Sequence, residues 1–148
     1  MNTNKILSSF FFLGSSVKKL NISNNFVNEP TSTRTKKNVD VEYEVHSIEE
    51  NSDEKITTGL VTLYVNVKLT EGKTKSTIKL IIDGCFGANS DAPIDDFKEL
   101  LSLNGCATLY SIARSLVLTT SAQVFNTGSI SLPMISIFEL RKAQGASE

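Results

Sequence analysis

The stretch from Leu100 to Phe138 carries one charged side chain, Arg114, in a chain whose charged fraction is 21%. The first half of this stretch has apolar residues at intervals of three and four, which places them on one face of a helix. These residues are Leu103, Cys106, Tyr110, Ala113 and Val117. Leu109, Ile112 and Leu116 widen the apolar face beyond the band that usually meets one core. We therefore expect a long helix that is buried by its own sheet and by another subunit.

This helix is not expected to cross a membrane, because Arg114 lies inside it and no run of about 20 apolar residues is present. Near the N-terminus, Ile6 to Leu13 is apolar and follows Lys5, as in a weak signal peptide. The small residues Gly14–Ser15–Ser16 follow it, but the apolar run is short, the positive region is one lysine and no A-x-A pattern is present. We expect a cytoplasmic protein; cleavage of Met1 to Ser16 would instead indicate a secreted structural or adhesive domain.

Alternating apolar and polar residues predict strands before this helix. The expected strands are Val17–Ile22, Val39–Ile48, Gly59–Leu69 and Lys75–Phe86, in a four-stranded antiparallel meander with one solvated face. Asp96 to Leu101 begins a helical region, and Pro133 fits the first turn of a last helix that ends near Ala143. Strands gathered before helices predict an α+β fold, with the sheet packed on one long helix and a shorter C-terminal helix. At 148 residues, the whole of 1–148 is expected to form a single domain.

Residues that could carry catalysis or bind a metal are scarce. His46 is the single histidine and lies among Asp40, Glu42 and Glu44, which fit a solvated strand face better than a carboxylate pair. Cys85 and Cys106 are far apart in the chain and suit reduced, packed thiols. No phosphate-binding loop or nucleophile elbow occurs. We predict no enzyme, no cofactor and no metal, and a net charge of -1 argues against nucleic acid as a partner.

Apolar residues in otherwise polar loops are the unusual feature that remains. Phe26 and Val27 lie in the long polar segment between the first two expected strands. Phe125, Ile130 and Leu132 lie in the Gly- and Asn-containing connector before the last helix. Such residues either form an exposed apolar patch that contacts another polypeptide or complete one compact core. The pattern alone leaves both alternatives open.

Three segments resemble SecB, the bacterial protein-export chaperone family. Cys106-Ala-Thr-Leu-Tyr-Ser-Ile-Ala-Arg114 is similar to its central helix, with Leu109, Tyr110, Ala113 and Arg114 at characteristic positions. Ser131-Leu132-Pro133, followed by Phe138-Glu139-Leu140, resembles the family's tail pattern. Asp83-Gly84-Cys85-Phe86 resembles the end of its last strand. The order and spacing of these segments carry the resemblance, over roughly residues 9 to 143.

The resemblance implies an ATP-independent holdase that binds unfolded or nascent polypeptides, for export or for protecting an antitoxin-like client. The client groove would lie between the first long loop and the connector, at Phe26, Val27, Phe125, Ile130 and Leu132. The family also implies a homotetramer, a dimer of dimers, whose interfaces here would include Leu109, Tyr110, Ala113 and Val117.

Two features of the chain depart from the family. Ala107 and Ser111 stand where the family's central helix has prolines. Lys19, Ser23 and Lys79 stand where export chaperones carry the acids that dock the translocase motor SecA, so docking to SecA is doubtful. The alternative function, from another class, is a carrier of small hydrophobic ligands that encloses a cavity between the same sheet and helix.

Overall fold

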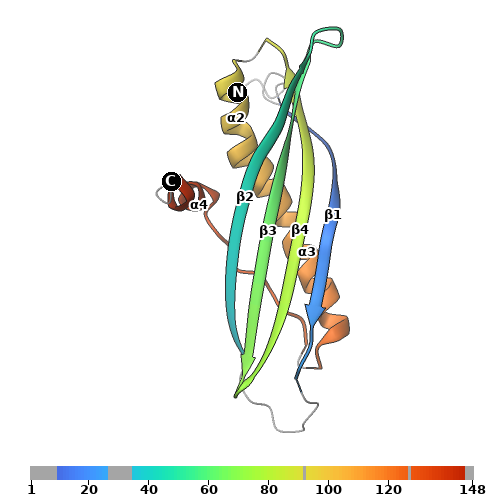
Figure 1. The fold of residues 1–148 in the computed structure, drawn as a ribbon, viewed down its shortest axis with the longest axis vertical. Coiled ribbons are helices and arrows are strands. Elements are labelled where there is room, and N and C mark those ends of the chain that lie inside the picture. The colour runs from blue at the N-terminus through green and yellow to red at the C-terminus, as the bar shows by residue number, and fades with distance from the viewer. Residues whose placement is uncertain (1–9, 27–34, 92, 127, 146–148) are drawn as a thin grey trace, which may run out of the picture.

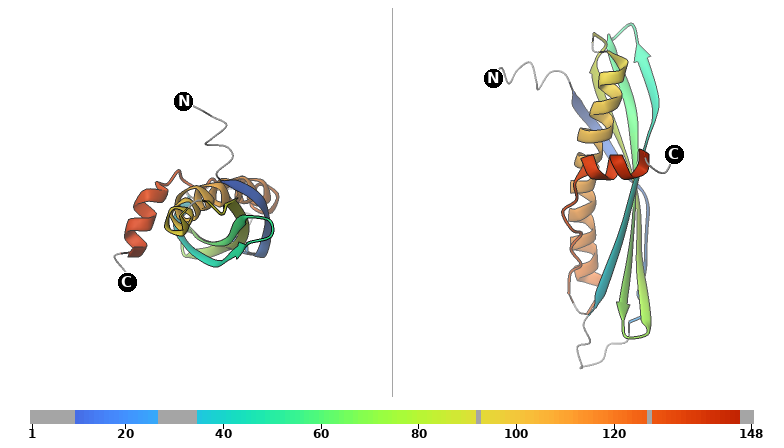
Figure 2. Two further views of the ribbon diagram at one scale, coloured as in Figure 1. Left: turned by 90° about the horizontal axis from the view of Figure 1, so that it is seen from above. Right: turned by 90° about the vertical axis from the view of Figure 1, so that its left-hand side faces the viewer.

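The computed structural model describes residues 10–26, 35–91, 93–126 and 128–145. Four long antiparallel strands form one curved sheet: β1 (Phe11–Ser23), β2 (Lys36–Asn51), β3 (Ile56–Glu71) and β4 (Thr74–Asn89). A helical rod follows, made of α2 (Ile94–Leu100), the π-helical η1 (Leu101–Gly105) and α3 (Cys106–Val124). The rod lies along the concave face of the sheet, whereas α4 (Ile137–Gly145) stands beside the edge formed by β2 (Figures 1 and 2). The predicted α+β fold is confirmed.

The strand order in the sheet is β1-β4-β3-β2, so the predicted simple meander is wrong for the first strand. β2, β3 and β4 do follow one another as hairpin neighbours, with Gly72 at a φ of 61° in the tight turn between β3 and β4. β1 instead pairs with β4, with Val17 opposite Ile82. The segment between β1 and β2 is too long for a hairpin loop, and it connects the two opposite edges of the sheet.

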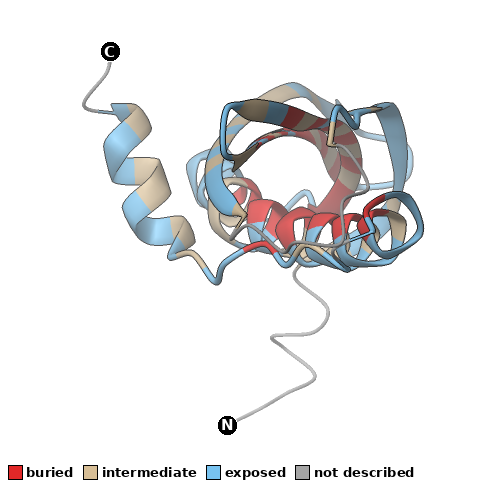
Figure 3. Cartoon of the chain, turned by 90° about the horizontal axis from the view of Figure 1, so that it is seen from below, coloured by how far each residue is buried: buried red, intermediate tan, exposed pale blue. Residues whose placement is uncertain are grey.

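The two faces of the sheet differ as the alternation predicts. The apolar residues on the inner face of the two central strands are at most 2% exposed, and Figure 3 shows buried residues along the sheet and the rod where the two face each other. On the two central strands these residues are Val61, Leu63, Val65, Val67, Leu69, Ile78, Leu80 and Ile82. Their neighbours in sequence, such as Thr62, Tyr64 and Lys79, point to the outer, convex face. The core therefore lies between the concave face of the sheet and the rod.

The rod is continuous from α2 through α3 and includes Asn104–Gly105. These two residues lie in η1, where the chain makes wider π-helical turns instead of ending a helix. Glycines on the sheet let the rod approach closely. A Cβ on Gly84 would lie 2.6 Å from Leu109 Cδ2, and one on Gly59 would lie 2.6 Å from Leu101 Cδ1.

The four residues predicted to form a subunit interface belong instead to the core of their own chain. Leu109, Tyr110, Ala113 and Val117 are 0–5% exposed and belong to the buried core cluster. A side chain that is already buried within one chain has little surface left for a second chain, so burial argues against this predicted interface. The opposite face of α3 is exposed at Ser111, Arg114, Ser115 and Leu118, and any contact between subunits through this helix would use that face.

The last helix, α4, begins at Ile137 and not at Pro133 as predicted. Pro133 stays in an extended connector, where its carbonyl oxygen accepts a hydrogen bond from the Tyr110 hydroxyl. None of the residues of α4 is buried. Among the residues that the structure describes, no helix is both long and apolar enough to cross a bilayer.

Candidate functional site

The apolar residues predicted to form a binding groove meet at one end of the molecule. The rings of Phe26 and Phe125 lie 5.9 Å apart between centroids and are tilted by 54°. Ile130 and Leu132, from the connector, pack in the same cluster. Val27 lies outside the described residues. The structure therefore brings together residues from the β1–β2 loop and from the connector, which are about 100 positions apart in the chain.

The loop residue Phe26 is positioned by the two asparagines that precede it. Asn24 Nδ2 donates to the Val124 carbonyl at the end of α3 (3.2 Å), and Asn24 Oδ1 accepts from the Phe26 amide (3.1 Å). Asn25 donates from its amide to Ser76 Oγ (2.9 Å) and from its side chain to the Lys75 carbonyl (3.0 Å). These bonds tie the end of β1 to both α3 and the start of β4.

The connector turns at Gly128, which has a φ of 106°, and then runs back along α3. Polar side chains of the helix hold it there. Ser121 Oγ accepts from the Ile130 amide (2.6 Å), and Arg114 Nε donates to the Leu132 carbonyl (3.3 Å). Farther back along the helix, Tyr110 bonds to Pro133, and burial raises the pKa of its phenol although Arg114 opposes this shift. The polar residues of the low-charge helix therefore serve to position the connector.

Burial divides the predicted binding residues into two groups. Phe125 is 4% exposed and Leu132 is 2% exposed, so both belong to the core, and their burial argues against a direct role in binding a client. Helix α3 ends immediately before Phe125, which turns this ring inward against Phe26. Phe26 and Ile130 are half-buried and keep surface that a partner could contact, so their role in binding stays a prediction.

Exposed apolar side chains lie beside this cluster. A shallow pocket of about 230 Å3 opens between α3 and the connector, and is lined by Arg114, Ser115, Leu118, Ser131 and Leu132. Leu118 is 42% exposed, and Met134, two residues beyond Leu132, is 83% exposed. We call this surface, made of Leu118, the connector residues 130–134 and Phe26, the connector channel. Leu118 and Met134 were missed as site residues because both sit in apolar runs that fit a core equally well.

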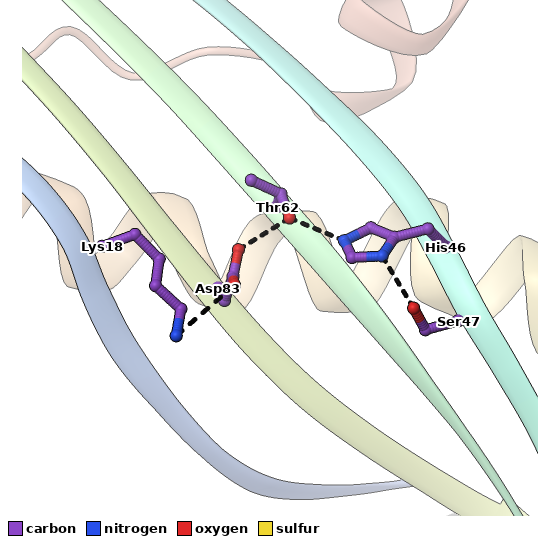
Figure 4. Close-up of polar contacts among 5 residues, drawn as sticks. All are labelled: Lys18, His46, Ser47, Thr62 and Asp83. Carbon is purple, nitrogen blue, oxygen red and sulfur yellow. Dashed lines mark hydrogen bonds and ion pairs between the residues drawn. The ribbon is translucent and has the colours of Figure 1, made fainter.

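A separate set of polar contacts crosses all four strands on the outer face (Figure 4). Thr62 Oγ1 donates to Asp83 Oδ1 (2.7 Å) and lies 2.8 Å from His46 Nε2. Because the one hydroxyl proton goes to Asp83, Nε2 must donate to Thr62 and carries a proton. Lys18 Nζ lies 4.0 Å from Asp83 Oδ2. His46 thus lies on the outer face, as predicted.

This arrangement does not resemble an activated nucleophile. In a catalytic triad the histidine accepts the proton of the hydroxyl, whereas here the histidine donates to the hydroxyl oxygen. Thr62 is also only 6% exposed, which leaves little room for a substrate. Thr62 therefore links β2, β3 and β4 through hydrogen bonds to His46 and Asp83.

The outer face also contains an open depression of about 540 Å3, with Lys19 and Lys79 on one side and Asp40 and Glu42 on the other. Lys19 and Lys79 are two of the positions at which export chaperones carry acids, and the structure brings them together here. Ser23, the third position, lies at the end of β1. The charge at this surface is mixed and does not present the acidic patch that a basic partner would bind.

The two cysteines are free, as predicted. Burial raises the pKa of the Cys106 thiol to about 12, so it is protonated at neutral pH and is a poor nucleophile. Cys85 is half-exposed. Within the described residues, no three His, Cys, Asp or Glu side chains gather closely enough to hold a metal ion.

Comparisons with known proteins are informative at the level of structure. No model of a known protein family matches the sequence, and no curated protein is similar to it in sequence. The SecB-like chaperone of Mycobacterium tuberculosis, solved in complex with a ChAD peptide from the HigA1 antitoxin, superimposes with a TM-score of 0.68 at 11% identity. The match covers 90% of this chain and 95% of that chain. A protein of unknown function from Streptococcus agalactiae matches with a TM-score of 0.49 at 13% identity, over 84% of this chain and 97% of that chain.

The first of these matches covers nearly the whole of both chains. At 11% identity it shows a shared fold. The resemblance inferred from the central helix and the tail pattern is therefore confirmed at the level of structure: this chain has the fold of a SecB-like chaperone.

Proposed function

We propose that this protein is an ATP-independent holdase that binds unfolded or nascent polypeptides along the connector channel. The observation that carries the proposal is the exposed apolar surface at Leu118 and Met134, beside a pocket formed by α3 and the connector. It lies on a fold shared with a chaperone that was solved with a bound peptide. We assign 1–148 as a single chaperone domain and propose that it acts in the cytoplasm.

The physical basis of binding would be the burial of apolar surface. Each Å2 of apolar surface removed from water contributes about 25 cal/mol to the free energy of binding. Contacts of client side chains with Leu118, Met134 and Ile130 would therefore favour binding. Such contacts do not demand a strict sequence in the partner. The low charge of α3 supports this proposal, because a client with apolar side chains would meet few charged groups that must lose water.

Assembly into a homotetramer, a dimer of dimers, is part of the proposal. β1 is an edge strand and exposes several large apolar side chains: Phe12, Leu13, Val17 and Leu20 are 38–51% exposed. Exposed apolar groups along one strand favour a contact with another chain. The exposed face of α3 around Ser111 and Ser115 offers a second, nearly uncharged surface.

The charge of the outer face bears on whether a client would be passed to SecA. Long-range attraction accelerates the binding of a basic docking partner when a surface is acidic. Lys19 and Lys79 remove that attraction at the depression they line. We therefore propose an antitoxin-like or other non-native client that is not handed to SecA.

A carrier of small hydrophobic ligands is less well supported by the structure. A carrier would need open space between the sheet and α3. That space is filled by side chains such as Leu63, Ile82 and Leu109, which are 0% exposed. The larger depression lies on the outer, polar face and has lysines and carboxylates in its wall.

The holdase proposal is tested by the suppression of aggregation of a reduced, unfolded test protein without ATP. The variant Leu118→Ser with Met134→Ser removes exposed apolar surface from the connector channel and should abolish most of the suppression. Ile94→Ser is the matched control, because Ile94 is 41% exposed, close to the 42% of Leu118, but is the first residue of α2, which lies at the other end of the rod (Figure 1). Equal suppression by the wild type and the double variant would contradict the proposal.

A further inference from the structure

The edge of β2 carries a contact that imitates the pairing of two strands. The Tyr43 amide donates to Gln144 Oε1 (2.9 Å), and Gln144 Nε2 donates back to the Tyr43 carbonyl (3.0 Å). A carboxamide has one acceptor and one donor side by side, as a peptide group of a paired strand presents. Gln144 thus forms the two hydrogen bonds that one residue of a neighbouring strand would form with Tyr43.

The same edge continues on both sides of Tyr43. Residues two apart in an antiparallel strand direct their backbone groups to the same side, and the pairing of β2 with β3 is uninterrupted from Lys36 to His46. Val41 and Val45 therefore also point their amide and carbonyl groups away from β3. Within the part of the chain that the structure describes, these groups of Val41 and Val45 have no hydrogen-bond partner. An unpaired edge of this kind is a template for another strand.

Helix α4, which supplies Gln144, has no fully buried residue, and only Ile137 and Leu140 of its apolar side chains pack in part against the core. It follows a connector whose described residues form neither helix nor strand. In Figure 3 it stands apart from the buried core, and it is linked to α2 by an exposed ion pair between Arg141 and Glu99 (3.4 Å). Surface ion pairs contribute little to stability, so displacement of this helix costs mainly the partial burial of Ile137 and Leu140 and the two hydrogen bonds of Gln144, which a pairing strand would replace.

The side chains of β2 define what kind of strand would fit. Val39, Val41, Tyr43 and Val45 are half-buried on the inner face, next to the core. Asp40, Glu42 and Glu44 alternate with them and are exposed on the outer face. A strand added at this edge would place every second side chain against the apolar row and the others beside the carboxylates.

We propose that an extended client segment pairs with the edge of β2 between Val39 and Val45, and that Gln144 of α4 covers this edge until the client displaces it. The fitting segment has apolar residues alternating with basic ones. This inference rests on the proposed function and adds how the polypeptide is held: by backbone pairing at the edge of β2, in addition to apolar contacts along the connector channel.

The test uses a fluorescein-labelled nine-residue peptide that alternates valine and lysine, with binding followed by anisotropy. Two further peptides of the same sequence carry N-methyl groups on the valines or on the lysines. In a strand these two sets of amides point to opposite sides, so one methylated peptide should lose at least about tenfold in affinity while the other binds as before. Gln144→Ala should tighten binding several-fold, because it removes the competing carboxamide.

A variant of the edge completes the test. Val41→Pro deletes one edge-facing amide without removing a bond to β3 and should weaken binding, whereas Val41→Ala keeps that amide and serves as its control. Should Val41→Pro fail to fold, the methylated peptides still decide, because they leave the protein unaltered. Replacing the lysines of the peptide by glutamates should also weaken binding, because these side chains would lie beside Asp40, Glu42 and Glu44. Equal binding of the lysine and glutamate peptides would overturn the placement of basic residues on the outer face.

The outcomes separate the two proposals. If both methylated peptides bind equally and Gln144→Ala changes nothing, the edge proposal is overturned while the holdase proposal stands. If no peptide binds and the wild type does not suppress aggregation, the proposed function itself has failed. A rise in native mass on Gln144→Ala would assign the edge to a second copy of this chain and overturn the client assignment.

Discussion

Removing the ring of Phe125 tests whether this residue belongs to the core or to an open groove. Phe125 is 4% exposed and packs on Phe26 at 5.9 Å. Truncation of a buried phenylalanine to alanine costs about 3–5 kcal/mol, which is a large share of the 5–15 kcal/mol that stabilises a typical domain. For a chain of this length, about 2–4 °C is lost per kcal/mol, so Phe125→Ala should lower the melting temperature by roughly 6–20 °C.

Thermal unfolding followed by circular dichroism measures this shift, and urea unfolding gives the free energy. Phe26→Ala is the paired variant, because its ring is half-buried and should cost clearly less. Met134→Ser is the control for an apolar residue that is 83% exposed, and it should leave the melting temperature within a few degrees. A Phe125→Ala protein that melts within about 2 °C of the wild type would refute the burial argument and return Phe125 to the exposed groove.

Four further predictions follow from the same packing. Ala113→Glu should destabilise the chain itself by several kcal/mol, because Ala113 is 0% exposed. Ser115→Glu, on the exposed face of α3, should leave the melting temperature unchanged but lower the native mass measured by light scattering; an unaltered mass would show that the tetramer does not pack through that face. Gly84→Ala should cost about 1–3 kcal/mol in urea unfolding, since its Cβ would lie 2.6 Å from Leu109 Cδ2; no loss would mean that the rod is not pressed on the sheet. Because burial raises the pKa of Cys106 to about 12 in the folded protein, the thiol of the unfolded chain ionises first as pH rises above about 9. The free energy of unfolding should therefore fall between pH 9 and 12, and less steeply in Cys106→Ala. A thiol reagent should modify Cys85 well before Cys106. Binding to SecA should be weak by calorimetry in physiological salt, and sub-micromolar affinity would restore the export interpretation.

Much of the fold was predictable because it depends on local periodicity. The alternation from Val39 to Val45 and from Val61 to Leu69 identified both strands and their buried faces, since a period of two allows no other arrangement with one wet face. The low-charge stretch identified the long helix. The strand order was not predictable, because a long loop after β1 does not reveal which strand β1 pairs with.

The candidate site was predictable in its location but not in its exposure. Phe26 and Phe125 meet as expected, yet the burial of Phe125 depends on where α3 ends. The path of the connector depends on hydrogen bonds from Ser121 and Arg114, two polar residues whose partners no sequence pattern specifies. Gln144 gave no signal at all, because an exposed glutamine on a helix is ordinary until the helix is placed beside a strand edge.

The most direct test of the account is hydrogen–deuterium exchange of the full chain, alone and with a permanently unfolded client. A holdase that uses the connector channel and the edge of β2 should gain protection in residues 125–134 and in residues 39–45 when the client is present, without ATP. The amides of α4 near Gln144 should exchange faster in the complex, because the helix leaves the edge. Unchanged exchange in both segments, or protection confined to the outer face around Lys19 and Lys79, would contradict the account.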